Sequence, residues 1–285
     1  MTSLNFPSTP SNGQIYEGYV YDSAKGVWKS LVQTPSLTSI DETIITSPTA
    51  GQKLIYDGTN WVNLTGYVFV QTLYYTSNGT FTKATYPWLR AIRVKCVGGG
   101  GGGGGAGTTT AGQTACGGGG GGGGYAESFI TNISGLDSSI TVTRGPGGAG
   151  GAAGANNGTS GSSSSFGSLV VAGGGGGGSG ISGSSLSASD PGNSGTGTTG
   201  DILMNGERGG WGYNAGTLPF GGFGGASGGG FGQSTGDLAS FAGAQGPAGQ
   251  LYGGGGGGAA NGASVATARA GGAGANGIVT VELYA

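Results

Sequence analysis

Val94-Lys95-Cys96-Val97 is a strand-like segment followed at once by eight consecutive glycines at 98–105, and this junction points to the architecture of the chain. A second run of eight glycines occupies 117–124 and leads into the apolar segment 125–130. Runs of six glycines follow at 173–178 and 253–258. Glycine loses more backbone entropy on folding than any other residue, so an ordered protein needs a compensating reason to keep such runs.

Two interpretations of the runs are open. Flexible linkers are rich in glycine, but disordered chains are usually highly charged and poor in apolar residues. Here charged residues make up 8% of the chain and hydrophobic residues 35%. A glycine run can instead form a polyproline II helix, with three residues per turn and a rise of about 3.1 Å per residue. Such a helix has no internal hydrogen bonds, so a buried bundle must pair its backbone groups between neighbours.

A helix at the edge of such a bundle needs glycine only at every third residue, because one of its faces points outward. This weaker pattern occurs at Gly148, Gly151 and Gly154, and again at Gly271, Gly274 and Gly277. We therefore predict an all-β protein without significant α-helix. In it a small β-sheet is interleaved with a bundle of polyglycine II helices, the full runs being central and the triplet runs peripheral.

The composition predicts two domains, 1–66 and 67–285. The first contains a degenerate repeat of period 38, seen where Pro10–Gln14 recurs as Pro48–Gln52. With small shifts in spacing, Tyr21 and Trp28 of the first copy correspond to Tyr56 and Trp61 of the second. The second copy predicts a β-hairpin, with strands at 53–56 and 61–64 around a turn at 57–60. Two small hairpins bury too little surface to stand alone, so this domain is expected to oligomerise or dock onto a larger assembly.

The second domain alternates strand signals with glycine. Alternating or β-branched segments predict strands, and three intervening stretches read as long polar loops. The predicted strands are 67–75, 81–83, 89–97, 126–133, 139–143, 168–172 and 277–283. The predicted loops are 152–167, 179–219 and 226–250.

Several functions are disfavoured by what the chain lacks. Its net charge is −2 and it has no basic patch, which argues against nucleic acid as a partner. It has no histidine, the commonest general base and metal ligand. The glycine runs match dinucleotide-binding motifs only trivially, because no helix follows them. We expect no cofactor, no metal, no secretory signal and no membrane span.

Four acidic residues in the predicted loops are the candidates for hydrolysis of a glycan. Such an enzyme needs two carboxylates about 5–10 Å apart. The four candidates are Asp190, Asp201, Glu207 and Asp237. Four acids spread over polar loops are equally typical of a soluble surface, and we expect a protein that is not an enzyme.

The two cysteines flank the first long loop, Cys96 before the first run and Cys116 before the second. A disulfide between them would join two adjacent glycine helices at the same end. Synthesis in a cytoplasm favours free thiols, whereas a particle that leaves the cell could oxidise them. The sequence leaves both states open.

Aromatic residues are concentrated in the last two predicted loops. Either they cover the side of the bundle or they are exposed for binding, and exposed Trp and Tyr dominate binding hot spots. The candidate receptor-binding residues are Trp211, Tyr213, Phe220, Phe223, Phe231 and Phe241.

The segment Tyr75-Thr76-Ser77-Asn78-Gly79-Thr80-Phe81-Thr82-Lys83, with 89–97 and the run at 98–105, resembles the opening of glycine-rich domains in bacteriophage tail fibres. Later blocks at 117–127, 168–178 and 271–283 are similar to the remaining segments of that domain. T-even-type phage adhesins stack such motifs as polyglycine helices and alternate them with variable loops. Receptors of the anaplastic lymphoma kinase type carry similar blocks, but with disulfides, signal sequences and kinase domains that this chain lacks.

The phage resemblance implies a tail-fibre or tail-tip adhesin, non-catalytic and located in the virion after assembly in the host cytoplasm. It implies attachment to other tail or baseplate proteins through 1–66 and a homotrimeric state. The partner on the host would be a surface glycan or an outer-membrane protein, bound by the loops. An ice-binding polyglycine bundle and a polysaccharide depolymerase remain as alternatives.

Overall fold

The computed structural model describes residues 6–16, 19–30, 43–44, 54–56, 61–63, 66–215, 218–230 and 243–285. The chain divides into two compact units, Met1–Gly66 and Tyr67–Ala285, at the boundary where the composition changes. The described residues form β-strands, irregular segments and two short 3₁₀ turns, η2 (Lys83–Thr85) and η3 (Gly228–Gly230), and contain no α-helix. The predicted all-β class is thereby confirmed.

The first unit consists of small sheets. Its strands are β1 (Ile15–Tyr16), β2 (Tyr19–Asp22), β3 (Val27–Ser30), β4 (Thr43–Ile44), β5 (Leu54–Tyr56) and β6 (Trp61–Asn63). β1, β2 and β3 form one antiparallel sheet, and the predicted hairpin is present as the antiparallel pair β5–β6. Tyr21 pairs with Trp28 in the first copy, and Tyr56 pairs with Trp61 in the second. The sequence repeat is therefore a repeat of one hairpin with a Tyr–Trp cross-strand pair.

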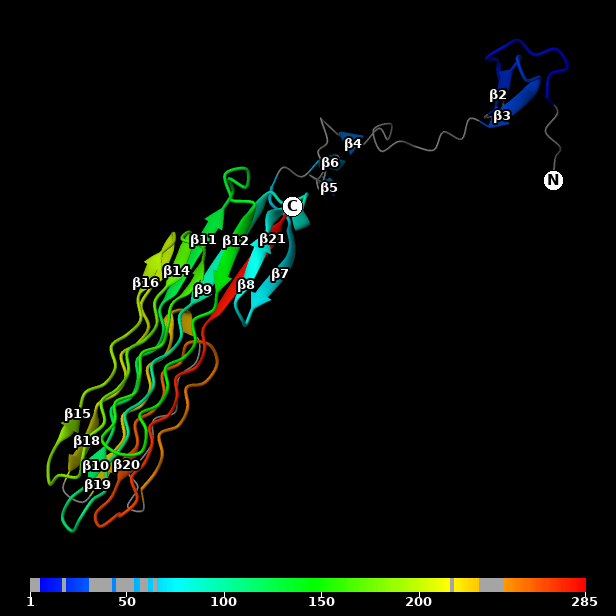
Figure 1. The fold of residues 1–285 in the computed structure, drawn as a ribbon. Helices are drawn as coiled ribbons and strands as arrows, with labels where there is room; N and C mark the ends of the chain where they lie inside the picture. Colours follow the sequence, from blue (N-terminus) through cyan, green and yellow to red (C-terminus); the bar gives the residue numbers. More distant parts are fainter. Residues whose placement is uncertain are drawn as a thin grey trace, which may run out of the picture. The chain divides into compact units, whose positions relative to one another are not determined.

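The second unit begins with two five-stranded antiparallel sheets (Figure 1). The first sheet has the order β17-β11-β9-β21-β7, with β17 (Ile202–Met204), β11 (Tyr125–Ile130), β9 (Ala91–Val97), β21 (Ile278–Tyr284) and β7 (Phe69–Tyr75). The second sheet has the order β16-β14-β13-β12-β8, with β16 (Gly197–Thr199), β14 (Val170–Ala172), β13 (Ser164–Phe166), β12 (Ser139–Thr143) and β8 (Gly79–Thr82).

The two sheets pack face to face as a sandwich. Alternate residues of the central strands, such as Val94 of β9 and Val281 of β21, are fully buried against Val142 and Phe166 of the other sheet. This alternation is the signal that predicted the strands. The sequence predicts one small sheet, whereas the structure has two, because β13, β16 and β17 lie in segments where the sequence predicts loops.

The sandwich passes directly into the glycine bundle. Sheets in a sandwich are held about 10 Å apart by their side chains. At Gly98, immediately after β9, an added Cβ would overlap the carbonyl oxygen of Gly173, which follows β14 of the opposite sheet. Strands separated by a hydrophobic core therefore come into backbone contact as soon as the side chains end.

The first run lies inside the bundle and is bonded only to other segments. Each N–H from Gly98 to Gly105 donates a hydrogen bond, at 2.8–3.0 Å, and every third residue meets the same neighbour. Gly98, Gly101 and Gly104, for example, all donate to the second run. The surrounding segments are 117–124, 156–162 and 269–275, which accept from the run, and 146–152, 173–179 and 253–259, which donate to it. This period of three and the absence of bonds within the run are the polyglycine II pattern.

The runs require glycine because it has no side chain, and not because of its backbone conformation. No glycine of either eight-residue run adopts a positive φ. A Cβ added to any residue of the second run would instead overlap backbone atoms of a neighbouring segment. The runs at 98–105, 117–124 and 253–258 are buried throughout, as predicted for central helices, whereas the run at 173–178 is only partly buried.

The stretches predicted to be long polar loops contain peripheral glycine helices, so that prediction is wrong in part; residues 231–242 of the third stretch lie outside the described residues. Segments 156–162, 190–196, 206–210, 222–228 and 244–249 all donate or accept hydrogen bonds as members of the bundle. The triplet at Gly271, Gly274 and Gly277 packs against the first run and against Val97, which precedes it, as predicted. The other triplet is shifted by one turn, because Gly145, Gly148 and Gly151 are buried while Gly154 has φ +118° and lies in a turn.

Short strands reappear at the end of the bundle away from the sandwich (Figure 1). They are β10 (Ala115–Cys116), β15 (Ala188–Ser189), β18 (Gly212–Ala215), β19 (Leu218–Phe220) and β20 (Ala260–Asn261). β10 pairs with β20, and β18 lies between β15 and β19. We call this part of the second unit the far end.

The suggested disulfide is not formed, since Cys96 and Cys116 are both free and buried. Cys96 pairs with Ala126 in the sandwich, whereas Cys116 pairs with Ala260 at the far end. The first run, roughly 25 Å long, lies between these two places. The two runs are antiparallel, because Val97 before the first run pairs with Tyr125 after the second. Cys96 therefore lies at the sandwich end of the bundle, and Cys116, at the start of the second run, lies at the opposite end.

Neither thiol is expected to react with Ellman's reagent at pH 8 while the protein is folded. Burial raises the pKa of Cys96 to about 12 and that of Cys116 to about 11, which suppresses the reactive thiolate. Unfolding in guanidinium should release two reactive thiols per chain. A folded protein that titrates rapidly, or an unfolded one that shows no thiols, would contradict this arrangement.

Candidate functional site

In the described part of the chain, four loops that connect neighbouring glycine helices form the far end. They are 106–116, 180–189, 260–269 and the described residues 211–215 and 218–220, named here the far-end loops. Ala106 bridges to both Ile181 and Arg269, and Thr114 bridges to Ser184. Because helices from distant parts of the chain lie side by side, residues as far apart in the sequence as Ala106 and Arg269, 163 positions, meet on one surface.

Asn214 ties three of these loops together. Its side chain is 2% exposed, and its amide nitrogen donates to the carbonyl oxygen of Thr114 at 3.1 Å and to the hydroxyl of Ser187 at 3.2 Å. Its side-chain oxygen accepts from the backbone N–H of Ser187. A buried amide satisfied in this way fixes its neighbours, because losing a partner leaves a polar group unpaired.

Asn261 and Thr109 hold the other side of the far end. The amide nitrogen of Asn261, which is fully buried, donates at 2.9 Å to the carbonyl oxygens of Gly107 and Thr267. The hydroxyl of Thr109 donates to the carbonyl oxygen of Gly262 and accepts from the N–H of Val265. The far-end loops are therefore linked to one another by side chains as well as by backbone.

Four of the six aromatic residues predicted as receptor contacts lie together on two adjoining segments. Trp211 is 52% exposed and Tyr213 is 48% exposed. These two side chains lie on the outer side of the segment, and the next residue, Asn214, is buried on its inner side. The Arg208 guanidinium lies 5.5 Å from the centre of the Trp211 ring. We name the set Trp211, Tyr213, Phe220 and Phe223 the aromatic strip.

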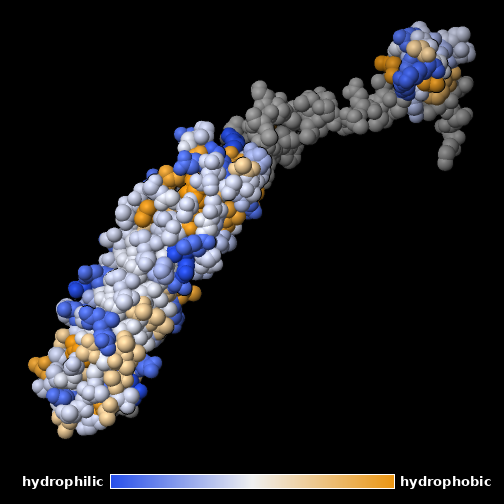
Figure 2. All heavy atoms as spheres, viewed as in Figure 1, coloured by the Kyte–Doolittle hydropathy of each residue, from blue (hydrophilic) through white to orange (hydrophobic). Residues whose placement is uncertain are grey.

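The remaining members of the strip pack beside these two. Phe220 pairs with Tyr213 across β18 and β19, and their rings stack with centroids 4.9 Å apart. Phe223 is also exposed, and its ring covers Gly210, where an added Cβ would overlap it. Phe231 and Phe241 lie outside the described residues. Figure 2 shows that hydrophobic residues gather over the sandwich and again near the far end, with a mainly pale stretch between them.

The three acidic candidates that the structure describes do not gather at one place. Asp190 lies toward the far end, where its carbonyl accepts from Ser179, whereas Asp201 lies beside the sandwich and accepts from the N–H of Phe129. Glu207 belongs to a peripheral glycine helix, and Asp237 is not among the described residues. In the described part of the chain, no three His, Cys, Asp or Glu side chains are grouped as metal ligands.

Sequence reasoning missed Asn214 and Asn261. Nothing in the local sequence marks either residue, because their partners are brought near only by the order of the helices in the bundle.

Within the ranges that the structure describes, no helix has the length and apolar character needed to cross a membrane.

Comparison with known proteins identifies a family. A search of curated proteins finds no match to the chain. The glycine-rich domain family matches residues 76–284, a range that starts just after β7 and includes the other strands of the sandwich, the bundle and the far end. The chain belongs to the glycine-rich domain family.

Proposed function

We propose that this protein is a tail-fibre or tail-tip adhesin of a bacteriophage, which binds a host surface glycan or outer-membrane protein without catalysis. The observation that carries the proposal is the far end itself. Loops from distant parts of the chain are fixed there by buried asparagines and present exposed aromatic rings. A bundle whose two eight-residue runs donate a hydrogen bond from every N–H separates them from the sandwich. Rigid support for a few exposed aromatic anchors is the arrangement expected of a receptor-binding surface.

The site in this proposal is narrower than the one expected from the sequence. Parts of the predicted loops belong to the bundle, so receptor contact is assigned to the far-end loops and to the aromatic strip. Trp211 and Tyr213 are the principal contacts, because Trp and Tyr are enriched in hot spots and both rings are about half exposed. Phe220 and Phe223 support them.

The other partners follow from the same proposal. Residues 1–66 would attach the chain to tail or baseplate proteins, since their hairpins are too small to be stable alone. The assembled protein would be a homotrimer in the virion, with no nucleic acid partner and no cofactor.

The purified chain is expected to compete with virions that carry it for adsorption to host cells. Changing Trp211→Ala and Tyr213→Ala together should raise the concentration needed for half-maximal competition by at least about 100-fold, which corresponds to about 3 kcal/mol for two hot-spot residues. Phe69→Ala is the matched control, because it removes an exposed ring from the sandwich. Wild-type protein that fails to compete would refute the receptor-binding proposal, and a double variant that competes like wild type would refute the assignment to the strip.

A further inference from the structure

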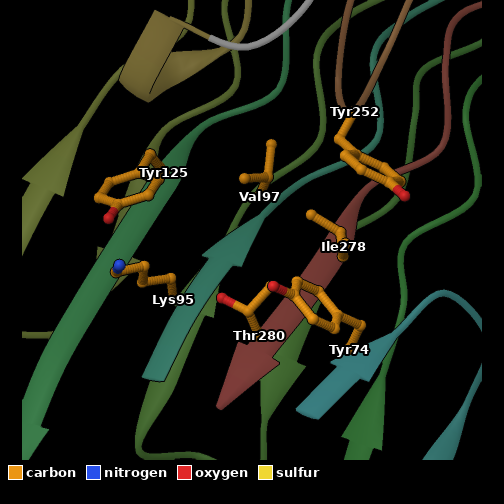
Figure 3. Close-up of a pocket in the computed structure, with 7 residues that line it drawn as sticks. All are labelled: Tyr74, Lys95, Val97, Tyr125, Tyr252, Ile278 and Thr280. Carbon is orange, nitrogen blue, oxygen red and sulfur yellow. The ribbon is translucent and has the colours of Figure 1, made fainter. Parts of the chain in front are cut away.

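A pocket of about 200 Å³ lies on the outer face of the sheet β17-β11-β9-β21-β7, where the sheet passes into the bundle. Its floor is formed by Val97 and Ile278, which are both buried. Figure 3 shows these two residues between Tyr125 on one side and Tyr74 and Tyr252 on the other. The second run, roughly 25 Å long, separates this place from the aromatic strip.

The ring of Tyr252 is held over the sheet by a tightly anchored turn. Leu251 has φ +51° and Gly253 has φ +79°. A leucine in the left-handed region is rare and persists where the surroundings impose it. The hydroxyl of Ser227 donates to the carbonyl oxygen of Tyr252 at 2.9 Å, and the N–H of Gly253 donates to Asn276 at 2.9 Å. The turn therefore has a fixed position beside the pocket.

The charges around the pocket balance one another. Lys95, which lines it, lies 2.6 Å from Glu282, and Arg93 lies 3.5 Å from Glu127. Burial tends to raise the pKa of Glu282, but hydrogen bonds from Lys95 and Tyr284 outweigh it, so this pKa is lowered and the carboxylate is charged. Two cations thus face two carboxylates, and the site calls for a ligand without net charge.

The pocket combines apolar walls with unused hydroxyl groups. In the part of the chain that the structure describes, the side-chain hydroxyls of Tyr74, Tyr252 and Thr280 make no hydrogen bond. Tyr74 is 69% exposed and can move to meet a ligand. Tyrosine rings also attract quaternary ammonium groups, which makes a cation the competing class of ligand. An amphipathic neutral ring suits these walls best.

We infer that this pocket binds one pyranose unit of a saccharide. The C–H face of the sugar would lie on Val97 and Ile278 against the tyrosine rings, and its hydroxyls would bond to Tyr74, Tyr252 and Thr280. The volume is below the roughly 300 Å³ at which pockets for drug-sized ligands begin, so it accommodates one ring. This site is separate from the far end and does not depend on the function proposed above.

Saturation-transfer NMR on the purified full-length chain tests the inference. The probes are the methyl glycosides of glucose, galactose, mannose and N-acetylglucosamine, with choline chloride as a cationic probe. At least one glycoside should bind, with a dissociation constant on the order of 1 mM for so few atoms. Tyr74→Ala should weaken binding at least about tenfold without changing the melting temperature, because that side chain is exposed.

Two further variants keep the result unambiguous. Thr280→Val preserves shape, removes one hydroxyl and should also weaken binding, which guards against misfolding of Tyr74→Ala. The double variant Trp211→Ala, Tyr213→Ala should bind glycosides like wild type, which separates this site from the far end. The inference is overturned if no glycoside in the panel binds, if choline binds and the glycosides do not, or if a glycoside binds equally to wild type, Tyr74→Ala and Thr280→Val.

Discussion

Gly101→Ala is expected to destabilise the second unit by at least about 3 kcal/mol, the upper range for overpacking a close-packed interior. For a domain of this size that corresponds to a fall in melting temperature of roughly 6–12 °C. The new Cβ would overlap the carbonyl oxygen of Gly176, far inside the 3.0 Å limit that real Cβ atoms respect. Neither partner can move away, because the Gly101 N–H donates to Gly121 and the Gly176 N–H donates to Asn193.

Gly173→Ala is the matched control. Gly173 also belongs to a glycine run in the bundle, but its added Cβ would lie 3.1 Å from the nearest atom, the carbonyl oxygen of Thr196. Both changes restrict the unfolded chain equally, which by itself stabilises by about 0.4–1 kcal/mol. The difference between the two melting curves therefore reports the packing of the first run. Equal melting of Gly101→Ala, Gly173→Ala and wild type would mean that the runs behave as flexible tethers.

This experiment addresses how such a bundle is stable with almost no side chains. Its interior has no hydrophobic core to bury, so its cohesion comes from close backbone packing and complete hydrogen bonding. The first run shows the arrangement in full, since its N–H groups from Gly98 to Gly105 all donate and its carbonyls from 99 to 104 all accept. One Cβ between two backbones would break several of these bonds at once.

The strands of the sandwich could be predicted from the sequence because side chains define them. The predicted strand at 139–143 coincides with β12, and the strands predicted at 89–97 and 277–283 contain most of β9 and β21. In each, residues facing the core alternate with residues facing outward. Alternation of buried and exposed residues can be recognised only over several consecutive positions. The three-residue strands β13, β16 and β17 are too short to show it.

The peripheral glycine helices were missed although their signal is present. Only one residue in three must be glycine there, so Ser, Thr, Asn and Ala fill the other positions and the segment looks like a polar loop. In 190–196, for example, only Gly192 and Gly195 are glycines, and both are buried. The same spacing occurs at Gly206 and Gly209. The period of three recognised near 148 and 271 therefore extends through stretches that were read as loops.

The far end could not be predicted because its contacts depend on which helices are neighbours. Asn214 donates to Thr114, which lies 100 positions earlier in the chain. All glycine helices present nearly the same surface to one another, so the sequence of a run does not identify its partners. The exposed rings of Trp211 and Tyr213 were found because they are large residues in a chain of small ones, but the asparagine that positions them was not.

Asn214→Asp is expected to open the far end while leaving the sandwich and the bundle folded. The change preserves shape but replaces the amide donor by a carboxylate oxygen, which then faces the carbonyl oxygens of Thr114 and Ser184. Leaving buried polar groups unpaired costs about 1–3 kcal/mol for each group. Amide exchange in 181–189 and 212–215 should therefore accelerate at least about 100-fold, with little change for the amides of β9 and β21.

Asn193→Asp adds the same charge at an exposed position of a peripheral helix, and exchange at the far end should remain as in wild type. Acidification that protonates the new carboxyl at 214 restores one donor, so protection in Asn214→Asp should partly return at low pH. A packing defect alone would show no such recovery. Unchanged exchange in 181–189 would mean that backbone bridges such as Thr114–Ser184 suffice to hold the far-end loops. Faster exchange throughout the second unit would instead mean that the far end and the bundle unfold as one cooperative body.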